Sequence, residues 1–166
     1  MDSDSLLPRA GAMPDLRGML ATIAREMHEC CADRWAVIGS AAAKLVGADV
    51  SVADIDLLVS GRDADLLTVR WATRRQRVDP DAEDRLFRSH FARYAFASWQ
   101  VEVMGDLELR TGHGWQPVRV VDTVNIDLGD VGVSVPSRAE QLRLLDSFGR
   151  PKDVRRAAIL RELVKG

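Results

Sequence analysis

The sequence has few cysteines and histidines, no long hydrophobic run and no excess of positive charge. Its two cysteines, Cys30 and Cys31, are adjacent, so they provide neither a secreted disulfide framework nor the spacing of a metal site. The histidines have no partner at ligand spacing, and we assign no zinc site. No apolar run approaches the 18 or so residues of a membrane span, and the first residues lack the basic and apolar regions of a signal peptide. We therefore expect no membrane association and a cytoplasmic location.

The charge balance argues against a protein that coats nucleic acid. The chain has 25 acidic and 23 basic residues and a formal charge of −2, whereas such proteins are usually basic. Apolar residues make up 46% and charged residues 29% of the 166 positions, which is ordinary for one globular domain. We find no internal repeat, and nothing in the sequence determines the oligomeric state.

The most informative stretch, residues 35–59, begins with an apolar strand and a glycine turn. Residues 35–38 form a short apolar run that ends at Gly39-Ser40, and residues 41–46 are rich in helix formers. A glycine lets the backbone approach a ligand closely, and the N–H groups at the start of the following helix favour anions. The hydroxyl of Ser40 can donate to a phosphate oxygen. The turn is therefore a candidate phosphate-binding element.

Two aspartates interrupt the beginning of the next apolar strand, predicted at residues 55–59. Because side chains on a strand alternate between faces, Asp54 and Asp56 share one face, about two residue rises apart. Two such carboxylates repel each other unless a cation lies between them, and carboxylate oxygens suit Mg²⁺ and Mn²⁺. A pair at this separation can also bridge two metal ions, as in phosphoryl-transfer sites. The stretch predicts a metal site beside the candidate phosphate-binding turn.

Gly39-Ser40, thirteen intervening residues and then Asp54-x-Asp56 resemble the signature of the polymerase-beta-like nucleotidyltransferase superfamily. That family carries a third carboxylate on a later strand, and Glu102 matches it. The resemblance implies transfer of a nucleoside monophosphate from a nucleoside triphosphate such as ATP to an acceptor hydroxyl, with release of pyrophosphate. It further implies that Asp54, Asp56 and Glu102 are catalytic ligands of Mg²⁺ or Mn²⁺, with Glu102 alternatively the base. Gly39 and Ser40 then bind the nucleotide.

Within that superfamily the chain is most similar to the small antibiotic and lincosamide nucleotidyltransferases. Their basic-Lys-Asp element resembles Arg150-Pro151-Lys152-Asp153, which follows Phe148-Gly149. The resemblance implies that Lys152 reaches a phosphate and that the acceptor is a small molecule such as an antibiotic. The alternative for Lys152 and Asp153 is a purely structural role at the end of a helix.

Other charged residues compete for these roles. Glu108 and Asp106 lie close to Glu102 in the sequence, and Asp106 follows a glycine and is expected in a turn. A basic cluster precedes them and is either a solvated surface or a rim that attracts an anionic substrate. It consists of Arg70, Arg74, Arg75 and Arg77.

The predicted fold is α/β (α+β), the nucleotidyltransferase fold, with a small mixed, mostly antiparallel sheet flanked by helices. Residues 1–13 are expected to be a flexible leader and residues 14–166 a single domain. Hydrophobic periodicity and capping residues predict the remaining elements. These are helices at 14–31, 62–71, 137–149 and 151–164, strands at 91–97 and 99–109, and short strands or hairpins within 118–135.

Three other interpretations stay open. The chain can be a toxin-type nucleotidyltransferase that modifies RNA or a protein with the same chemistry. It can be a catalytically silent nucleotide-binding module of the same fold. The motif can also be a chance match, in which case Asp54 and Asp56 would lie far from Glu102.

Overall fold

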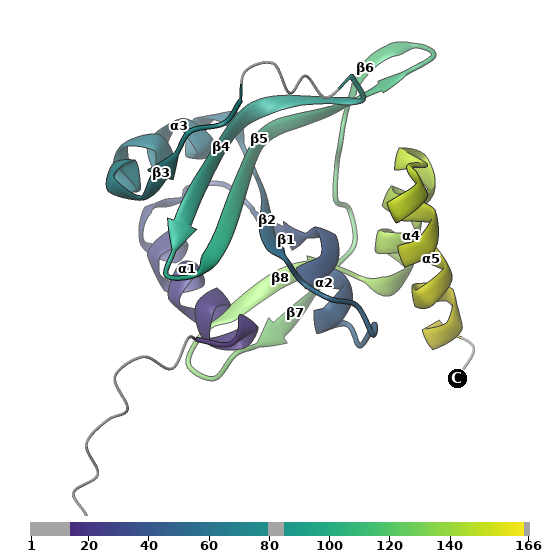
Figure 1. Ribbon diagram of the computed structural model, residues 1–166, viewed down its shortest axis with the longest axis horizontal. Helices are drawn as coiled ribbons and strands as arrows, with labels where there is room; N and C mark the ends of the chain where they lie inside the picture. Colours follow the sequence, from purple (N-terminus) through teal and green to yellow (C-terminus); the bar gives the residue numbers. More distant parts are fainter. Residues whose placement is uncertain (1–13, 80–84, 165–166) are drawn as a thin grey trace, which may run out of the picture.

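The fold is built on a six-stranded mixed sheet that carries Asp54, Asp56 and Glu102. The structure, a computed structural model, describes residues 14–79 and 85–164, so the predicted leader at 1–13 lies outside the described residues (Figure 1). The strand order is β1-β2-β5-β4-β3, with β6 paired to β5. Of its pairings only β2 with β5 is parallel, which confirms the predicted mixed, mostly antiparallel sheet. The strands are β1 Ala36–Ile38, β2 Asp54–Val59, β3 Arg75–Gln76, β4 Phe87–Phe96, β5 Trp99–Thr111 and β6 Gly114–Pro117.

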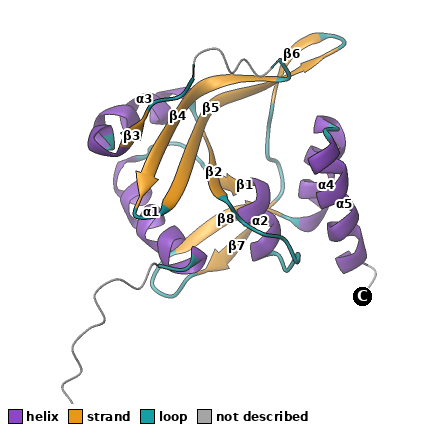
Figure 2. Cartoon of the chain, in the orientation of Figure 1, coloured by secondary structure: helices purple, strands orange, loops and turns teal. Residues whose placement is uncertain are grey.

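Helices cover both faces of this sheet, and their positions follow the predicted periodicity. Figures 1 and 2 show α1 and α3 on one side of the long β4–β5 hairpin and α4 and α5 on the other. Each predicted helix is present, with ends that differ from the prediction by at most two residues. The helices are α1 Leu16–Cys30, α2 Gly39–Leu45, α3 Gly61–Arg70, α4 Arg138–Phe148 and α5 Pro151–Val164, with a short 3-10 turn at Ala72–Arg74.

Strand alternation separates a buried face from a face that carries polar groups. The side chains of Ile55 and Leu57 on β2 and of Val101 and Val103 on β5 are fully buried in the main core, which also contains apolar side chains of α1 and α3. The alternate residues of β2, including Asp54 and Asp56, point to the opposite face of the sheet and are half-buried. The strands are thus held by their apolar residues, and the acidic residues remain available to a ligand.

The β4 and β5 strands differ from the prediction in extent and in one local detail. Strand β4 begins at Phe87 rather than at residue 91, and β5 continues to Thr111. The expected turn at Asp106 is wrong: Asp106 lies inside β5, has a φ of 49°, and accompanies a register shift opposite residues 88–90 of β4. This is a β-bulge, which needs one residue outside the regular strand conformation.

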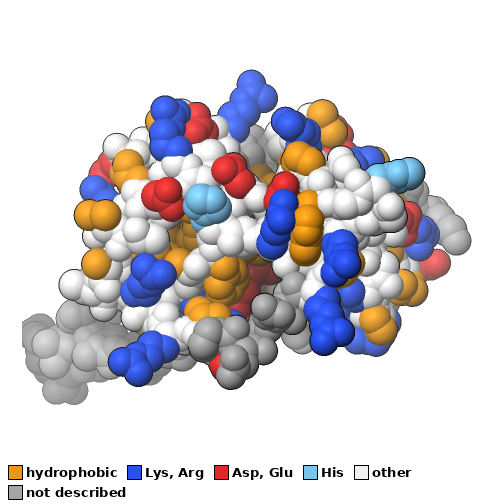
Figure 3. Space-filling view, turned by 90° about the horizontal axis from the view of Figure 1, so that it is seen from above, with side chains coloured by type: hydrophobic (Ala, Val, Ile, Leu, Met, Phe, Trp, Pro, Cys, Tyr) orange, Lys and Arg blue, Asp and Glu red, His pale blue; other side chains and the backbone are white. Residues whose placement is uncertain are grey.

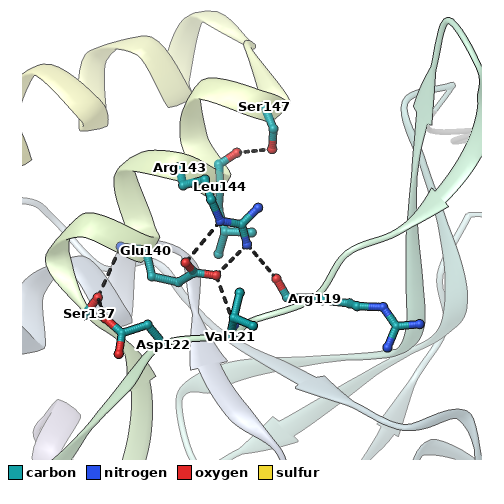
Figure 4. A network of polar contacts seen from close by, with 8 residues as sticks. All are labelled: Arg119, Val121, Asp122, Ser137, Glu140, Arg143, Leu144 and Ser147. Atoms are coloured by element: carbon teal, nitrogen blue, oxygen red, sulfur yellow. Dashed lines mark hydrogen bonds and ion pairs between the residues drawn. The ribbon is translucent and has the colours of Figure 1, made fainter.

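A second, two-stranded sheet follows, formed by β7 Thr123–Asp127 and β8 Gly132–Pro136. The segment 118–122 before it is not a strand, although its composition suggested one. Its backbone is instead bound by α4: buried Glu140 accepts the Val121 N–H at 3.1 Å, and Arg143 donates to the Arg119 carbonyl at 2.8 Å (Figure 4). These contacts anchor the connection between the two sheets.

Among the residues that the structure describes, no helix combines the length and apolar character needed to cross a bilayer.

Candidate active site

The glycine turn and the second aspartate are in direct contact. Ile38 pairs with Asp56 in the antiparallel register of β1 and β2, so Gly39 follows immediately beside that carboxylate. Gly39 has a φ of +70°, and a Cβ added there would lie 2.4 Å from Oδ2 of Asp56. Only glycine tolerates both this backbone conformation and this proximity. The turn therefore lies directly against the acidic strand, and binding of phosphate and metal by the two stays a prediction.

Glu102 lies on the neighbouring strand β5, directly opposite Asp56. In the parallel register of β2 and β5, Asp54 pairs with Gln100 and Asp56 with Glu102. Adjacent strands lie about 4.8 Å apart and paired residues share a face, so the three carboxylates point to the same side. The chance-match interpretation, which required Glu102 to be distant, is therefore wrong.

These groups border a cavity of about 520 Å³ between the sheet and the helices α4 and α5. Gly39, Asp56, Glu102 and Lys152 line it together, whereas Asp54 and Ser40 lie next to lining residues without themselves lining it. Its apolar lining includes Phe87, Phe91 and Met104 of the sheet and Leu144, Leu145 and Phe148 of α4. The molecular face in Figure 3 is hollowed near its middle, where hydrophobic and acidic side chains lie inside and Lys and Arg side chains surround the opening.

The first turns of α5 direct positive charge at the carboxylates. Lys152 and Arg156 both line the cavity, and four residues place them on one side of the helix. Arg150 does not contribute a free cation, because its guanidinium donates to buried Asp153 at 2.6 Å and lies over the ring of Phe87. Asp153 therefore has the structural role that the sequence analysis left open for it.

Burial and mutual repulsion make the aspartates reluctant to ionise. Burial, and then the charges of Glu102 and Asp54, raise the pKa of Asp56 to about 7, against the opposing effect of Lys152 and Arg156. Burial and Glu102 also raise the pKa of Asp54, while Arg93 and Lys152 oppose the rise. Acidic groups with raised pKa values inside a cavity are typical of functional sites, and a cation would relieve their repulsion.

Asp54 and Asp56 fit a hard divalent ion such as Mg²⁺. In proteins Mg²⁺ is usually held by one or two carboxylates, with water and substrate phosphates completing its shell. Within residues 14–79 and 85–164, no three Asp, Glu, His or Cys side chains already form a cluster able to hold an ion. Oε1 of Glu102 accepts hydrogen bonds from Arg93 and Gln100. Its role as a third metal ligand stays a prediction.

Two cavity residues escaped the sequence analysis. Arg156 could have been identified from its four-residue spacing from Lys152. The sequence indicated Arg93 less clearly. The strand was predicted to begin only at residue 91, and polar and apolar side chains do not alternate regularly in that short stretch. The predicted basic rim does not line this cavity: Arg70 pairs with Glu29 at 2.9 Å, and Arg74 pairs with another glutamate of α1.

Comparison with known proteins agrees with this architecture. No protein-family model and no curated protein sequence matches the chain. A solved structure described as a "putative nucleotidyltransferase" from Thermotoga maritima is 22% identical, with 88% of this chain and 92% of that chain covered and a TM-score of 0.65. An antigenic nucleotidyltransferase-like protein from Paracoccidioides brasiliensis is 14% identical, with 89% and 76% covered and a TM-score of 0.51. The chain has the fold of these nucleotidyltransferase-like structures.

Proposed function

We propose that this chain is a metal-dependent nucleotidyltransferase, which moves a nucleoside monophosphate from a triphosphate such as ATP to a hydroxyl of a small molecule. The observation that carries the proposal is the register of β1, β2 and β5. It places Asp54, Asp56 and Glu102 on one face of adjacent strands, with Gly39 against Asp56. Lys152 faces them across the cavity. The similar solved structures support the same class of activity.

Each group has a role in this reaction. Asp54 and Asp56 hold Mg²⁺ or Mn²⁺, which neutralises charge on the phosphates when bound. The backbone of Gly39 and the hydroxyl of Ser40 contact the β- and γ-phosphates. Among the described residues, no side chain caps the start of α2. Lys152 and Arg156 neutralise the remaining phosphate charge from the opposite wall.

The transfer itself is an in-line displacement at the α-phosphorus. The acceptor oxygen bonds to phosphorus and loses its proton to water, while the bond from phosphorus to the α,β-bridging oxygen breaks. Pyrophosphate leaves with the electron pair of that bond. The protein contributes position and charge, which are the main sources of catalysis in phosphoryl transfer.

A second, more open groove gives the acceptor a path to the nucleotide. Its volume is about 1,410 Å³, and it runs past the C-terminal end of β2, past residues 106–108 within β5 and along the segment 118–121. It shares Leu58 and Leu107 with the cavity at Asp56, so the two hollows adjoin. The cavity lies within the size range of small-ligand sites, whereas the groove exceeds it. We assign the nucleotide to the cavity and the acceptor to the groove.

The test is transfer of label from an α-labelled triphosphate in the presence of Mg²⁺, with aminoglycosides and lincosamides as the first acceptors. Wild type is compared with Asp56→Ala and with a matched control, Asp49→Ala, at an exposed position that lines neither hollow. We expect labelled product with wild type and the control only. Retained transfer by Asp56→Ala would remove the proposed metal role.

The same preparation separates the alternatives. If Mg²⁺ and a non-hydrolysable triphosphate raise the melting temperature but no acceptor is labelled, the chain is a silent nucleotide-binding module. If label enters RNA or protein from a cell extract rather than a small molecule, the toxin-type activity is correct. If metal and triphosphate leave the melting temperature unchanged, the proposal fails.

A further inference from the structure

The contact between Arg93 and Glu102 is given no role in the function proposed above, although both residues line the cavity beside Asp56. The two residues are direct cross-strand partners in β4 and β5. Nε and Nη2 of Arg93 both donate to Oε1 of Glu102, at 3.2 and 2.9 Å. The Nε2 of Gln100 donates to the same oxygen at 3.1 Å. One oxygen of Glu102 therefore accepts three N–H groups.

This arrangement fixes a permanent positive charge beside the carboxylates. Asp56, Glu102 and Arg93 lie in one row across three neighbouring strands, and Arg93 lines the cavity. A guanidinium does not lose its proton in proteins, so the charge is present at every working pH. The side chains of Arg93 and Glu102 are 30% and 18% exposed, which limits screening of the pair by solvent.

The pair also makes the site less favourable for a second metal ion. A two-metal phosphoryl-transfer site needs enough carboxylate oxygens to bridge and hold two divalent ions. Here Arg93 and Gln100 engage Oε1 of Glu102, and a second dication near the Arg93 guanidinium would be repelled. Asp54 and Asp56 suffice for one ion. Arginine, in turn, is well suited to binding phosphate oxygens and to stabilising charge on a transferring phosphoryl group.

We propose that this site works with a single divalent ion and that Arg93, held by Glu102, supplies the positive charge of a second. Arg93 contacts the transferred phosphate through the N–H groups that Glu102 does not engage. Glu102 is then a positioning residue for Arg93 rather than a metal ligand. This inference rests on the proposed function, since it concerns the same nucleotide and the same ion.

The experiment counts metal ions instead of measuring turnover. Mn²⁺ is titrated into the full chain with a saturating α,β-methylene triphosphate, and free Mn²⁺ is followed by electron paramagnetic resonance. We expect one bound ion per chain for wild type, for Arg93→Lys and for Glu102→Gln. Arg93→Met frees Glu102 and is expected to bind a second ion. Its affinity for the analogue is expected to fall about tenfold, because a charge-assisted contact is lost.

Arg110→Met is the matched control, because Arg110 is exposed on β5 and lines neither hollow. It should match wild type in both measurements. Two ions in wild type, or loss of the single ion in Glu102→Gln, would overturn the one-ion inference while leaving the transferase proposal intact. If wild type binds neither Mn²⁺ nor the analogue, the proposed function fails and the inference fails with it.

Discussion

Asp56 is expected to lower the stability of the metal-free protein at neutral and alkaline pH, so Asp56→Asn should raise it. The carboxyl is half-buried and faces Asp54 and Glu102, with Lys152 and Arg156 as opposing charges. Its pKa is about 7 in the folded protein and 3.8 when unperturbed. Each unit of difference corresponds to about 1.4 kcal/mol, so the cost of ionising Asp56 reaches at most about 4 kcal/mol.

The sign determines the pH window. Because the folded pKa is the higher one, the folded state binds the extra proton between pH 4 and pH 7. The contribution of neutral Asp56 to stability is therefore complete below pH 4 and is lost as the pH rises through 7. Asn removes the titrating charge and keeps the shape. The stability difference between Asp56→Asn and wild type should increase from pH 4 to pH 7 and then remain constant.

The assay is urea denaturation in a chelating buffer at pH values from 4.5 to 8.5. At pH 8 the variant should exceed wild type by a measurable fraction of the 4 kcal/mol limit, about 1–3 kcal/mol, because solvent screens part of the cost. Asp49→Asn, at an exposed position, should differ by less than about 0.5 kcal/mol. Equal or lower stability of Asp56→Asn at pH 8 would refute the electrostatic description of the site.

Three further substitutions test other parts of the structure. Tyr94→Phe should leave the melting temperature unchanged or raise it, because the buried Tyr94 hydroxyl has no hydrogen-bond partner within residues 14–79 and 85–164. A loss above about 1 kcal/mol would contradict this. Gly39→Ala should cost about 1–3 kcal/mol in denaturation, owing to its positive φ and the contact with Asp56, whereas Gly112→Ala, with open space around it, should be neutral. Glu140→Gln should lower the free energy of unfolding by about 1–3 kcal/mol above pH 5. This loss should shrink as the pH falls, because Arg143 lowers the pKa of the Glu140 carboxyl in the folded protein, and a pH-independent loss would refute the charge argument.

Local chemistry was sufficient to predict one half of the site. The turn at Gly39 and the shared face of Asp54 and Asp56 follow from backbone rules that act over a few residues. Helix and strand positions were predicted for the same reason, since hydrophobic periodicity reports directly on the buried face. The alternation that buried Ile55 and Leu57 is the one that places both aspartates on the opposite face and presents Asp56 to the cavity.

The connections between distant segments could not be predicted in this way. No local rule specifies that Asp56 pairs with Glu102 in a parallel register, or that Arg93 lies one strand further across the sheet. For Glu102 the superfamily pattern supplied what physical reasoning from the residues did not. For Arg93 there was no such pattern, and its importance became visible only through its hydrogen bonds to Glu102.

The segment 118–122 is a case in which local composition predicted an element that tertiary contacts prevent. Its β-branched composition favours a strand, but in the structure Glu140 and Arg143 of α4 bind its backbone instead. The sequence by itself determined the helices, the central strands β2 and β5 and which of their side chains share a face, because these depend on periods of two and 3.6 residues. Only the tertiary structure decided that Glu102 accepts hydrogen bonds from an arginine and that Asp56 lines the cavity. The reason is that strand register and helix docking depend on how the whole core packs.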